Sequence, residues 1–271
     1  MKEIKFKISY KYGDANNGRL DMYDASVSLQ GFAKALSITT HALLNDGEVR
    51  RKGNNIDGAK LFIHPSRKGS FEELITLAVD NKVALAIGTS ILANVFYDLI
   101  KWTWSITVDK QYEPETHHVK RLKEKVEPFI GEIEEALEVP LEQAHRPIKQ
   151  NEEMTITIVR PKVGDIIKLD TETLQSVSLQ TESDVIPDVI GNVTKYNILS
   201  GIGRFYDDNN EKTVSFKLLD SVSTVQKQWL TWSLHHAQEQ IGAGKIKMSV
   251  QRVLSAKGAI KRYLVHSISQ A

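Results

Sequence analysis

The first part of the chain predicts a small α/β unit. Apolar residues alternate with lysine and serine over residues 4–10, which is the period of a half-buried strand. A helical period follows over about 24–45. Apolar runs separated by a turn-forming stretch then predict a β-hairpin over 60–79. The order β-α-β-β defines a first predicted domain at residues 1–80.

Residues 83–108 form an apolar segment that predicts one long helix. Its first fifteen residues carry no charge, but fifteen helical residues rise only ~22 Å, less than the ~30 Å hydrocarbon core of a bilayer. Its polar positions recur at spacings of four, four and three, which places them on one helix face. We call them the polar stripe: Ser90, Asn94, Asp98 and Lys101.

The polar stripe has two interpretations. In an oligomeric channel it would line a water-filled pore, since charges within a membrane face the lumen. In a soluble oligomer it would face solvent or another chain while the rest of the helix is buried. A charged helix is expected over about 114–137, and Pro140 and Pro147 are expected to break the chain after it. Together with the apolar segment, these features define a second predicted domain, residues 81–150.

The last part, residues 151–271, predicts a β-rich domain. A helix over about 222–241 is expected between the third and fourth of five strands. The order β-β-β-α-β-β is that of a small OB-type barrel, although other small barrels share parts of it. The strands are expected at about 188–197, 202–207, 213–219, 245–254 and 259–267. The predicted fold class is therefore α+β.

Side-chain alternation predicts a basic outer surface on this barrel. Val214 and Phe216 should point inward, so that the residues between them point outward. Positive charge and flat aromatic side chains on one barrel face are what single-stranded nucleic acid requires. The alternative is that tyrosine and basic residues are simply common on exposed strands. The candidate nucleic-acid-binding residues are Lys195, Arg204, Tyr206, Lys217 and Arg262.

Composition narrows the class of protein. The chain has 271 residues, of which 41% are hydrophobic and 25% charged, as in an ordinary globular protein, and this excludes global disorder. A net charge of +1 argues against a uniformly basic coat. The absence of cysteine excludes disulfides and thiolate chemistry. The N-terminal pattern predicts no secretory signal, so the expected location is the cytoplasm, with association to the inner membrane as the alternative.

No catalytic motif is found. Residues 67–70 lack the spacing of a phosphate-binding loop, and residues 201–203 are too short for a dinucleotide fingerprint. The histidine pairs 117–118 and 235–236 lack the i, i+4 spacing of a zinc helix. We therefore predict a protein that is not an enzyme and that uses no metal and no cofactor.

Several short segments resemble those of a family of uncharacterised bacterial proteins encoded near phage-related and defence genes. These segments are Ser28–Phe32, Lys68–Phe71, Tyr196–Asn197 and Gly201–Arg204. The chain also resembles the membrane-effector partner in Hailong-type anti-phage operons, which pair it with a nucleotidyltransferase. That resemblance implies a homo-oligomeric channel controlled by a DNA oligomer, and a nucleotidyltransferase as partner.

These observations lead to one hypothesis and one alternative. The hypothesis is a non-enzymatic homo-oligomer that acts as an effector or sensor in anti-phage defence. Its barrel would bind single-stranded nucleic acid or an oligonucleotide, and its apolar helix would form the oligomeric or membrane-active, channel-like element. The alternative is a soluble structural or interaction protein, related to phage or mobile elements, without any membrane role.

Overall fold

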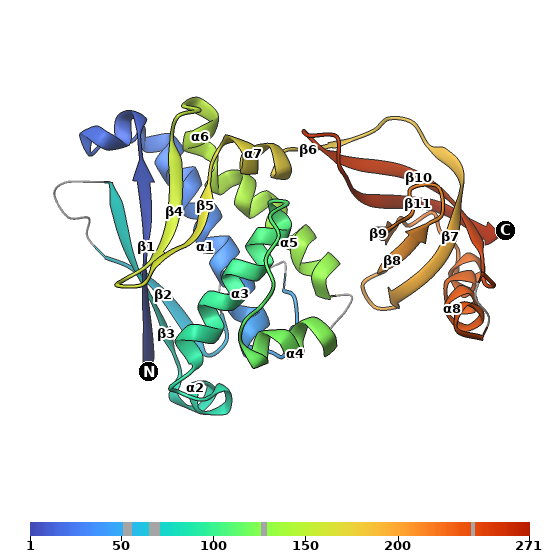
Figure 1. The fold of residues 1–271 in the computed structure, drawn as a ribbon, viewed down its shortest axis with the longest axis horizontal. Coiled ribbons are helices and arrows are strands. Elements are labelled where there is room, and N and C mark those ends of the chain that lie inside the picture. Colours follow the sequence, from blue (N-terminus) through green and yellow to red (C-terminus); the bar gives the residue numbers. More distant parts are fainter. Residues whose placement is uncertain (51–55, 65–70, 126–128, 240–241) are drawn as a thin grey trace. The chain divides into compact units, whose positions relative to one another are not determined.

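The protein is described by a computed structural model that covers the chain apart from residues 51–55, 65–70, 126–128 and 240–241 (Figure 1). The chain divides into two compact units, Met1–Val177 and Ser178–Ala271. Unit 1 combines helices with an antiparallel sheet, and unit 2 is a small barrel with one helix. The predicted α+β class is confirmed.

Unit 1 contains one sheet with the strand order β2-β3-β1-β4-β5. The strands are β1 (Lys2–Lys11), β2 (Ala59–Ile63), β3 (Glu72–Val79), β4 (Thr155–Arg160) and β5 (Gly164–Leu169). The helices are the short 3₁₀ helix η1 (Gly13–Asn17), α1 (Met22–Leu44), α2 (Asn81–Ile87), α3 (Leu92–Thr107), α4 (His117–Lys125), α5 (Phe129–Ala144), α6 (Arg146–Gln150) and α7 (Thr171–Val177). The helices α1, α3 and α5 lie on one side of the sheet (Figure 1).

The central strand β1 confirms the alternation expected at the N-terminus. Ile4, Phe6, Ile8 and Tyr10 are all buried in the core of this unit. The ring of Phe6 lies 5.8 Å from that of Phe96 on α3. The hydroxyl of Tyr97 donates a 2.7 Å hydrogen bond to the carbonyl of Lys5, so α3 is tied to β1.

The helices α1 and α5 approach each other closely at Gly31. A Cβ at this position would lie 2.5 Å from the backbone nitrogen of Ala144 and from the carbonyl oxygen of Pro140. The hydroxyl of Ser28 donates a 2.7 Å hydrogen bond to the carbonyl of Ala144. The segment Ser28–Phe32, one of those that carried the resemblance, therefore has a packing role.

The apolar segment does not form the single helix expected over residues 83–108. Gly88 (φ 100°) ends α2, and α3 begins at Leu92. Glycine adopts this conformation without the steric cost that a side chain would impose. Ser90 consequently lies in the turn between the two helices, and not on the face that carries the rest of the polar stripe.

The break expected at Pro140 is also wrong, because α5 continues through this residue to Ala144. Proline removes a backbone donor, but Leu137 and Leu141 on either side are fully buried. Burial of an apolar face supplies most of a helix's stability in a folded protein, so it can offset that loss. In place of the charged helix expected over 114–137, the structure has α4 and α5, with 126–128 outside the described residues. The hairpin turn expected at 65–69 and part of the Lys68–Phe71 segment also lie outside them.

The division between the units differs from the expected domain boundaries at 80/81 and 150/151. Strand β4 pairs with β1, for example at Ile8 and Ile158, and β5 pairs with β4. The residues from 151 to 177 therefore complete the sheet of unit 1, and the barrel begins after Val177. Such a pairing joins residues 150 positions apart, which local periodicity does not reveal.

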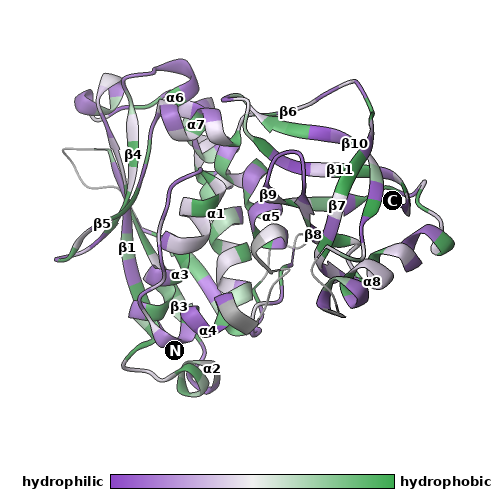
Figure 2. Ribbon diagram, turned by 45° about the vertical axis from the view of Figure 1, so that its right-hand side comes forward, coloured by the Kyte–Doolittle hydropathy of each residue, from purple (hydrophilic) through white to green (hydrophobic). Residues whose placement is uncertain are grey.

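Unit 2 is a closed barrel with an OB-like fold. Its strands are β6 (Leu179–Thr181), β7 (Ile186–Asn197), β8 (Ile202–Asp207), β9 (Lys212–Leu218), β10 (Ile246–Ser255) and β11 (Ile260–Gln270), with α8 (Thr224–Glu239) between β9 and β10. The order β11-β9-β8-β7-β10 closes through pairing of β10 with β11, and β9 and β11 are parallel. Both hydrophilic and hydrophobic residues occur along β10 (Figure 2), and its buried and partly exposed positions alternate from Ile246 to Val250, as expected when one face of a strand lines the barrel interior.

The barrel interior is filled by aromatic and aliphatic side chains, including the fully buried Phe205 and Phe216. The ring of Tyr196 stacks on that of Phe216 at 6.1 Å. A Cβ at Gly203 would lie 2.4 Å from the Phe216 ring, so a glycine is needed where the ring crosses the strand. The segment Gly201–Arg204, which also carried the resemblance, thus includes a residue required by packing.

Among the helices in the described part of the chain, none is both long and apolar enough to cross a bilayer.

Candidate functional site

Three of the five candidate residues on the barrel form a single row across four strands. Lys195 on β7 is paired with Arg204 on β8, and Arg204 is paired with Ser215 on β9. Ser215 is paired in turn with Arg262 on β11. Directly paired residues point to the same face of a sheet, with Cβ atoms about 5 Å apart. We call Lys195, Arg204 and Arg262 the cationic row.

The cationic row lies on the outer surface of the barrel, because the neighbours of Arg204 and Ser215 along their strands, Phe205 and Phe216, point inward. A guanidinium nitrogen of Arg204 donates a 3.3 Å hydrogen bond to the hydroxyl of Ser215. Partial burial lowers the pKa of Lys195, and the positive charge of Arg204 lowers it further. The positive charges of Lys195 and Arg204 therefore lie close enough to influence each other.

The other two candidates lie on the same outer face, on opposite sides of the row. Lys217 is two residues beyond Ser215 on β9, and Tyr206 is two residues beyond Arg204 on β8. Tyr206 is 38% exposed, whereas Arg262 is only 8% exposed. The structure thus brings the five predicted residues onto one face, with Arg262 the least accessible of them.

The turn between β7 and β8 contributes two residues that the sequence analysis missed. Ile198 is 73% exposed and Leu199 is 97% exposed. The side-chain oxygen of Asn197 accepts a 2.9 Å hydrogen bond from the backbone N–H of Leu199, which holds the turn in shape. Asn197 and Gly201 are turn-forming residues, so the sequence places the two apolar residues between them in a turn. That position was the available signal that Ile198 and Leu199 would be exposed.

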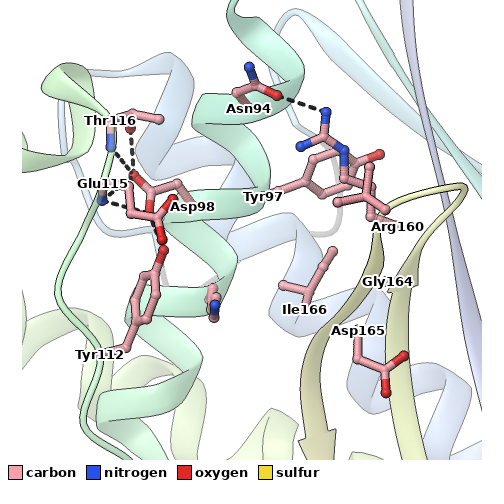
Figure 3. Close-up of a pocket in the computed structure, with 12 residues that line it drawn as sticks. Asn94, Tyr97, Asp98, Tyr112, Glu115, Thr116, Arg160, Gly164, Asp165 and Ile166 are labelled. Carbon is pink, nitrogen blue, oxygen red and sulfur yellow. Dashed lines mark hydrogen bonds between the residues drawn. The ribbon is translucent and has the colours of Figure 1, made fainter.

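The polar stripe lies within unit 1, where Asp98 is a buried hydrogen-bond acceptor. Its carboxylate accepts hydrogen bonds from the Tyr112 hydroxyl at 2.8 Å, from the Glu115 N–H at 3.1 Å, and from the N–H and hydroxyl of Thr116 at 2.7 and 2.6 Å (Figure 3). Burial raises the pKa of Tyr112, and the hydrogen bond to Asp98 and the charge of that carboxylate raise it further. Asp98 therefore fixes the segment that leads into α4.

Asn94 and Lys101 line a pocket together with Asp98. The pocket has a volume of about 390 Å³ and lies between α3 and the β4–β5 hairpin. Arg160 at the end of β4 donates a 2.8 Å hydrogen bond to the side-chain oxygen of Asn94, and its guanidinium carbon lies 4.6 Å from the centre of the Tyr97 ring (Figure 3). Three members of the polar stripe thus face other elements of the same unit.

Over the ranges described here, no three acidic or histidine side chains come together so as to hold a metal ion. The buried His145 instead makes contacts of 2.6 Å with the carbonyl of Leu141 and 2.8 Å with the hydroxyl of Thr173.

The fold and these two surfaces define a two-unit protein: a helix-covered antiparallel sheet followed by an OB-like barrel. The chain belongs to the family described as "Domain of unknown function (DUF7946)", whose model matches residues 6–178. A second model, "Family of unknown function (DUF7947)", matches residues 187–269. The first match ends one residue after the division between the units, at Ser178, and the second lies within unit 2. No curated protein and no solved structure matches the chain.

Proposed function

We propose that this protein is a binding module whose barrel holds single-stranded nucleic acid or an oligonucleotide on the outer face of β7, β8, β9 and β11. The barrel would recognise the ligand without transforming it. The observation that carries this proposal is the strand register, which puts Lys195, Arg204 and Arg262 in one row.

The charge of the row supports a phosphate ligand. Lysine and arginine supply most of the affinity for a nucleic-acid backbone, because each neutralised phosphate releases counterions. Strands separated by about 4.8 Å place the row across roughly 14 Å of surface, which is long enough for more than one phosphate. Arginine also offers a planar set of donors that matches phosphate geometry.

The side chains beside the row support single-stranded rather than duplex ligands. Unpaired bases need flat or apolar surfaces on which to stack, and each such contact is worth about 1–3 kcal/mol. Tyr206 lies on one side of the row, and the exposed Leu199 lies in the turn beyond the other. OB barrels that bind oligonucleotides use this same combination of the second and third strands with the first loop.

Fluorescence anisotropy with the full chain tests the proposal. Labelled DNA and RNA single strands of about 16 nucleotides, the upper site size of one OB fold, serve as probes. We expect Arg204→Ala and Tyr206→Ala each to weaken binding at least fivefold, since loss of about 1 kcal/mol corresponds to that factor. Lys227→Ala is the matched control, because Lys227 is exposed on α8 and outside the strands that carry the cationic row.

If the protein is instead a structural or interaction protein, the expected binding results are the opposite. No single-stranded probe would bind at low salt, or every variant, Lys227→Ala included, would lose the same small amount. Either result would favour a protein partner at the apolar turn of Ile198 and Leu199 over a nucleic acid.

A further inference from the structure

The pocket between α3 and the β4–β5 hairpin carries an inference that does not depend on the barrel. Its volume of about 390 Å³ is near the lower end of the range for small-molecule sites. It is lined mainly by polar and charged side chains, and all of them belong to unit 1. The question is which ligand chemistry these side chains fit.

Two cations line the pocket, and each is held over an aromatic ring. The ammonium of Lys101 lies 4.4 Å from the centre of the Tyr112 ring, and the guanidinium of Arg160 lies 4.6 Å from that of Tyr97. Neither cation forms an ion pair with a carboxylate of the residues that the structure describes. The rings thus position both cations, and neither cation is in direct contact with a carboxylate in the described part of the chain.

The acid deepest in the pocket is already satisfied by the protein. Asp98 is 6% exposed, and its oxygens accept hydrogen bonds from Tyr112, Glu115 and Thr116. The other two acids that line the pocket, Glu115 and Asp165, are exposed. The acceptor positions of Asp98 are therefore occupied by protein donors, whereas Lys101 and Arg160 retain N–H donors that can reach a ligand.

We propose that this pocket binds a small organic anion through a carboxylate or phosphate group held by Arg160 and Lys101. The planar guanidinium accommodates either group through parallel hydrogen bonds, and Lys101 adds a point charge. Because Tyr97, Tyr112 and Asn94 already restrain the two cations, little side-chain freedom would be lost on binding. The size of the pocket fits a small metabolite and not a polymer.

Nuclear magnetic resonance of the full chain labelled with ¹⁵N tests this site directly. Inorganic phosphate and succinate are added in separate titrations, and the Nε–H signal of Arg160 is followed after assignment by its loss in Arg160→Gln. We expect at least one anion to shift this signal along a saturating curve with a dissociation constant of about 1 mM, which corresponds to a weak but specific contact. The anion that saturates the signal distinguishes a phosphate ligand from a carboxylate ligand.

Two controls keep the proposal falsifiable. Lys101→Gln should weaken the binding at least fivefold, whereas Lys168→Gln, on the exposed side of β5 and outside the pocket, should leave it unchanged. Arg19, already paired with Asp14 at the surface, gives an internal reference signal. The proposal is overturned if the Arg160 signal moves without saturation for both anions, as Arg19 would, or if Lys101→Gln binds like the wild type.

Discussion

The hydroxyl of Thr116 donates a 2.6 Å hydrogen bond to the buried carboxylate of Asp98 and so joins α3 to the residue that precedes α4. The carbonyl of Thr116 accepts the first hydrogen bond of α4, from the N–H of Lys120. The carboxylate of Asp98 therefore accepts hydrogen bonds from backbone N–H groups just before α4, those of Glu115 and Thr116. A negative charge is favoured at this end of a helix by the helix dipole. The charge that stands out in the apolar segment has a structural function in unit 1.

Asp98→Ala should destabilise unit 1 by at least about 3 kcal/mol, because several donors lose a buried acceptor at once. Asp98→Asn should give an intermediate loss, since the amide keeps one acceptor oxygen. Urea unfolding measures both. In a background with Trp229→Phe and Trp232→Phe, the fluorescence reports only on Trp102 and Trp104 of unit 1.

Asp165→Ala is the control for this series. Asp165 lines the same pocket but is exposed, so its removal should change the free energy of unfolding by no more than about 0.5 kcal/mol. Equal effects of Asp98→Ala and Asp165→Ala would show that the hydrogen bonds of Asp98 contribute nothing to stability.

Gly31→Ala should destabilise unit 1 by about 1–3 kcal/mol, although alanine is normally the better helix former. The reason is that the added methyl group would meet the backbone of α5 at 2.5 Å. The same fluorescence measurement applies, with Gln30→Ala on the exposed side of α1 as the control. A stabilised Gly31→Ala variant would mean that α1 and α5 are not in close contact at this point.

Unit 1 should lose stability on mild acidification because of His145. Burial lowers the pKa of this histidine to about 4, whereas the unfolded chain titrates near 6.5. The folded state then binds fewer protons than the unfolded state between these values. Stability is fully present above pH ~6.5 and falls as the pH drops toward 4, by up to about 3 kcal/mol.

The contribution of His145 can be isolated by substitution. His145→Gln should show a smaller loss of unfolding free energy than the wild type between pH ~7 and ~4, because the amide does not titrate. The exposed His117 offers the matched control, since His117→Gln should keep the wild-type dependence. An unchanged pH dependence in His145→Gln would refute the assignment.

Local patterns were sufficient to predict the barrel and its outer face. Each strand has one face inside the barrel. The alternation of Val214 and Phe216 with Ser215 and Lys217 therefore indicates directly which side chains point inward and which point outward. The order of elements then supplied the OB-like topology. The register that aligns Lys195 with Arg204 could not be read from the sequence, because a bulge between Val193 and Lys195 shifts the pairing.

The fold of unit 1 was harder to predict, because contacts between residues far apart in the sequence determine its strand pairing and the extent of its helices. The pairing of β4 with β1 and the passage of α5 through Pro140 depend on burial against distant residues. The spacing of Asn94, Asp98 and Lys101 correctly indicated one helix face. That face contacts Tyr112 and Thr116, from the segment before α4, and Arg160 on β4, and these two segments left no local signal.

The salt dependence of oligonucleotide binding by the full chain tests the central claim most directly. The account predicts that the logarithm of the binding constant falls linearly with the logarithm of salt concentration, by about 0.7 per phosphate contacted on a single strand. Arg204→Ala should reduce that slope by about the value for one contact, whereas Lys227→Ala should leave it unchanged. Binding that is absent at low salt, or that does not change with salt, would contradict a phosphate-binding role for the cationic row.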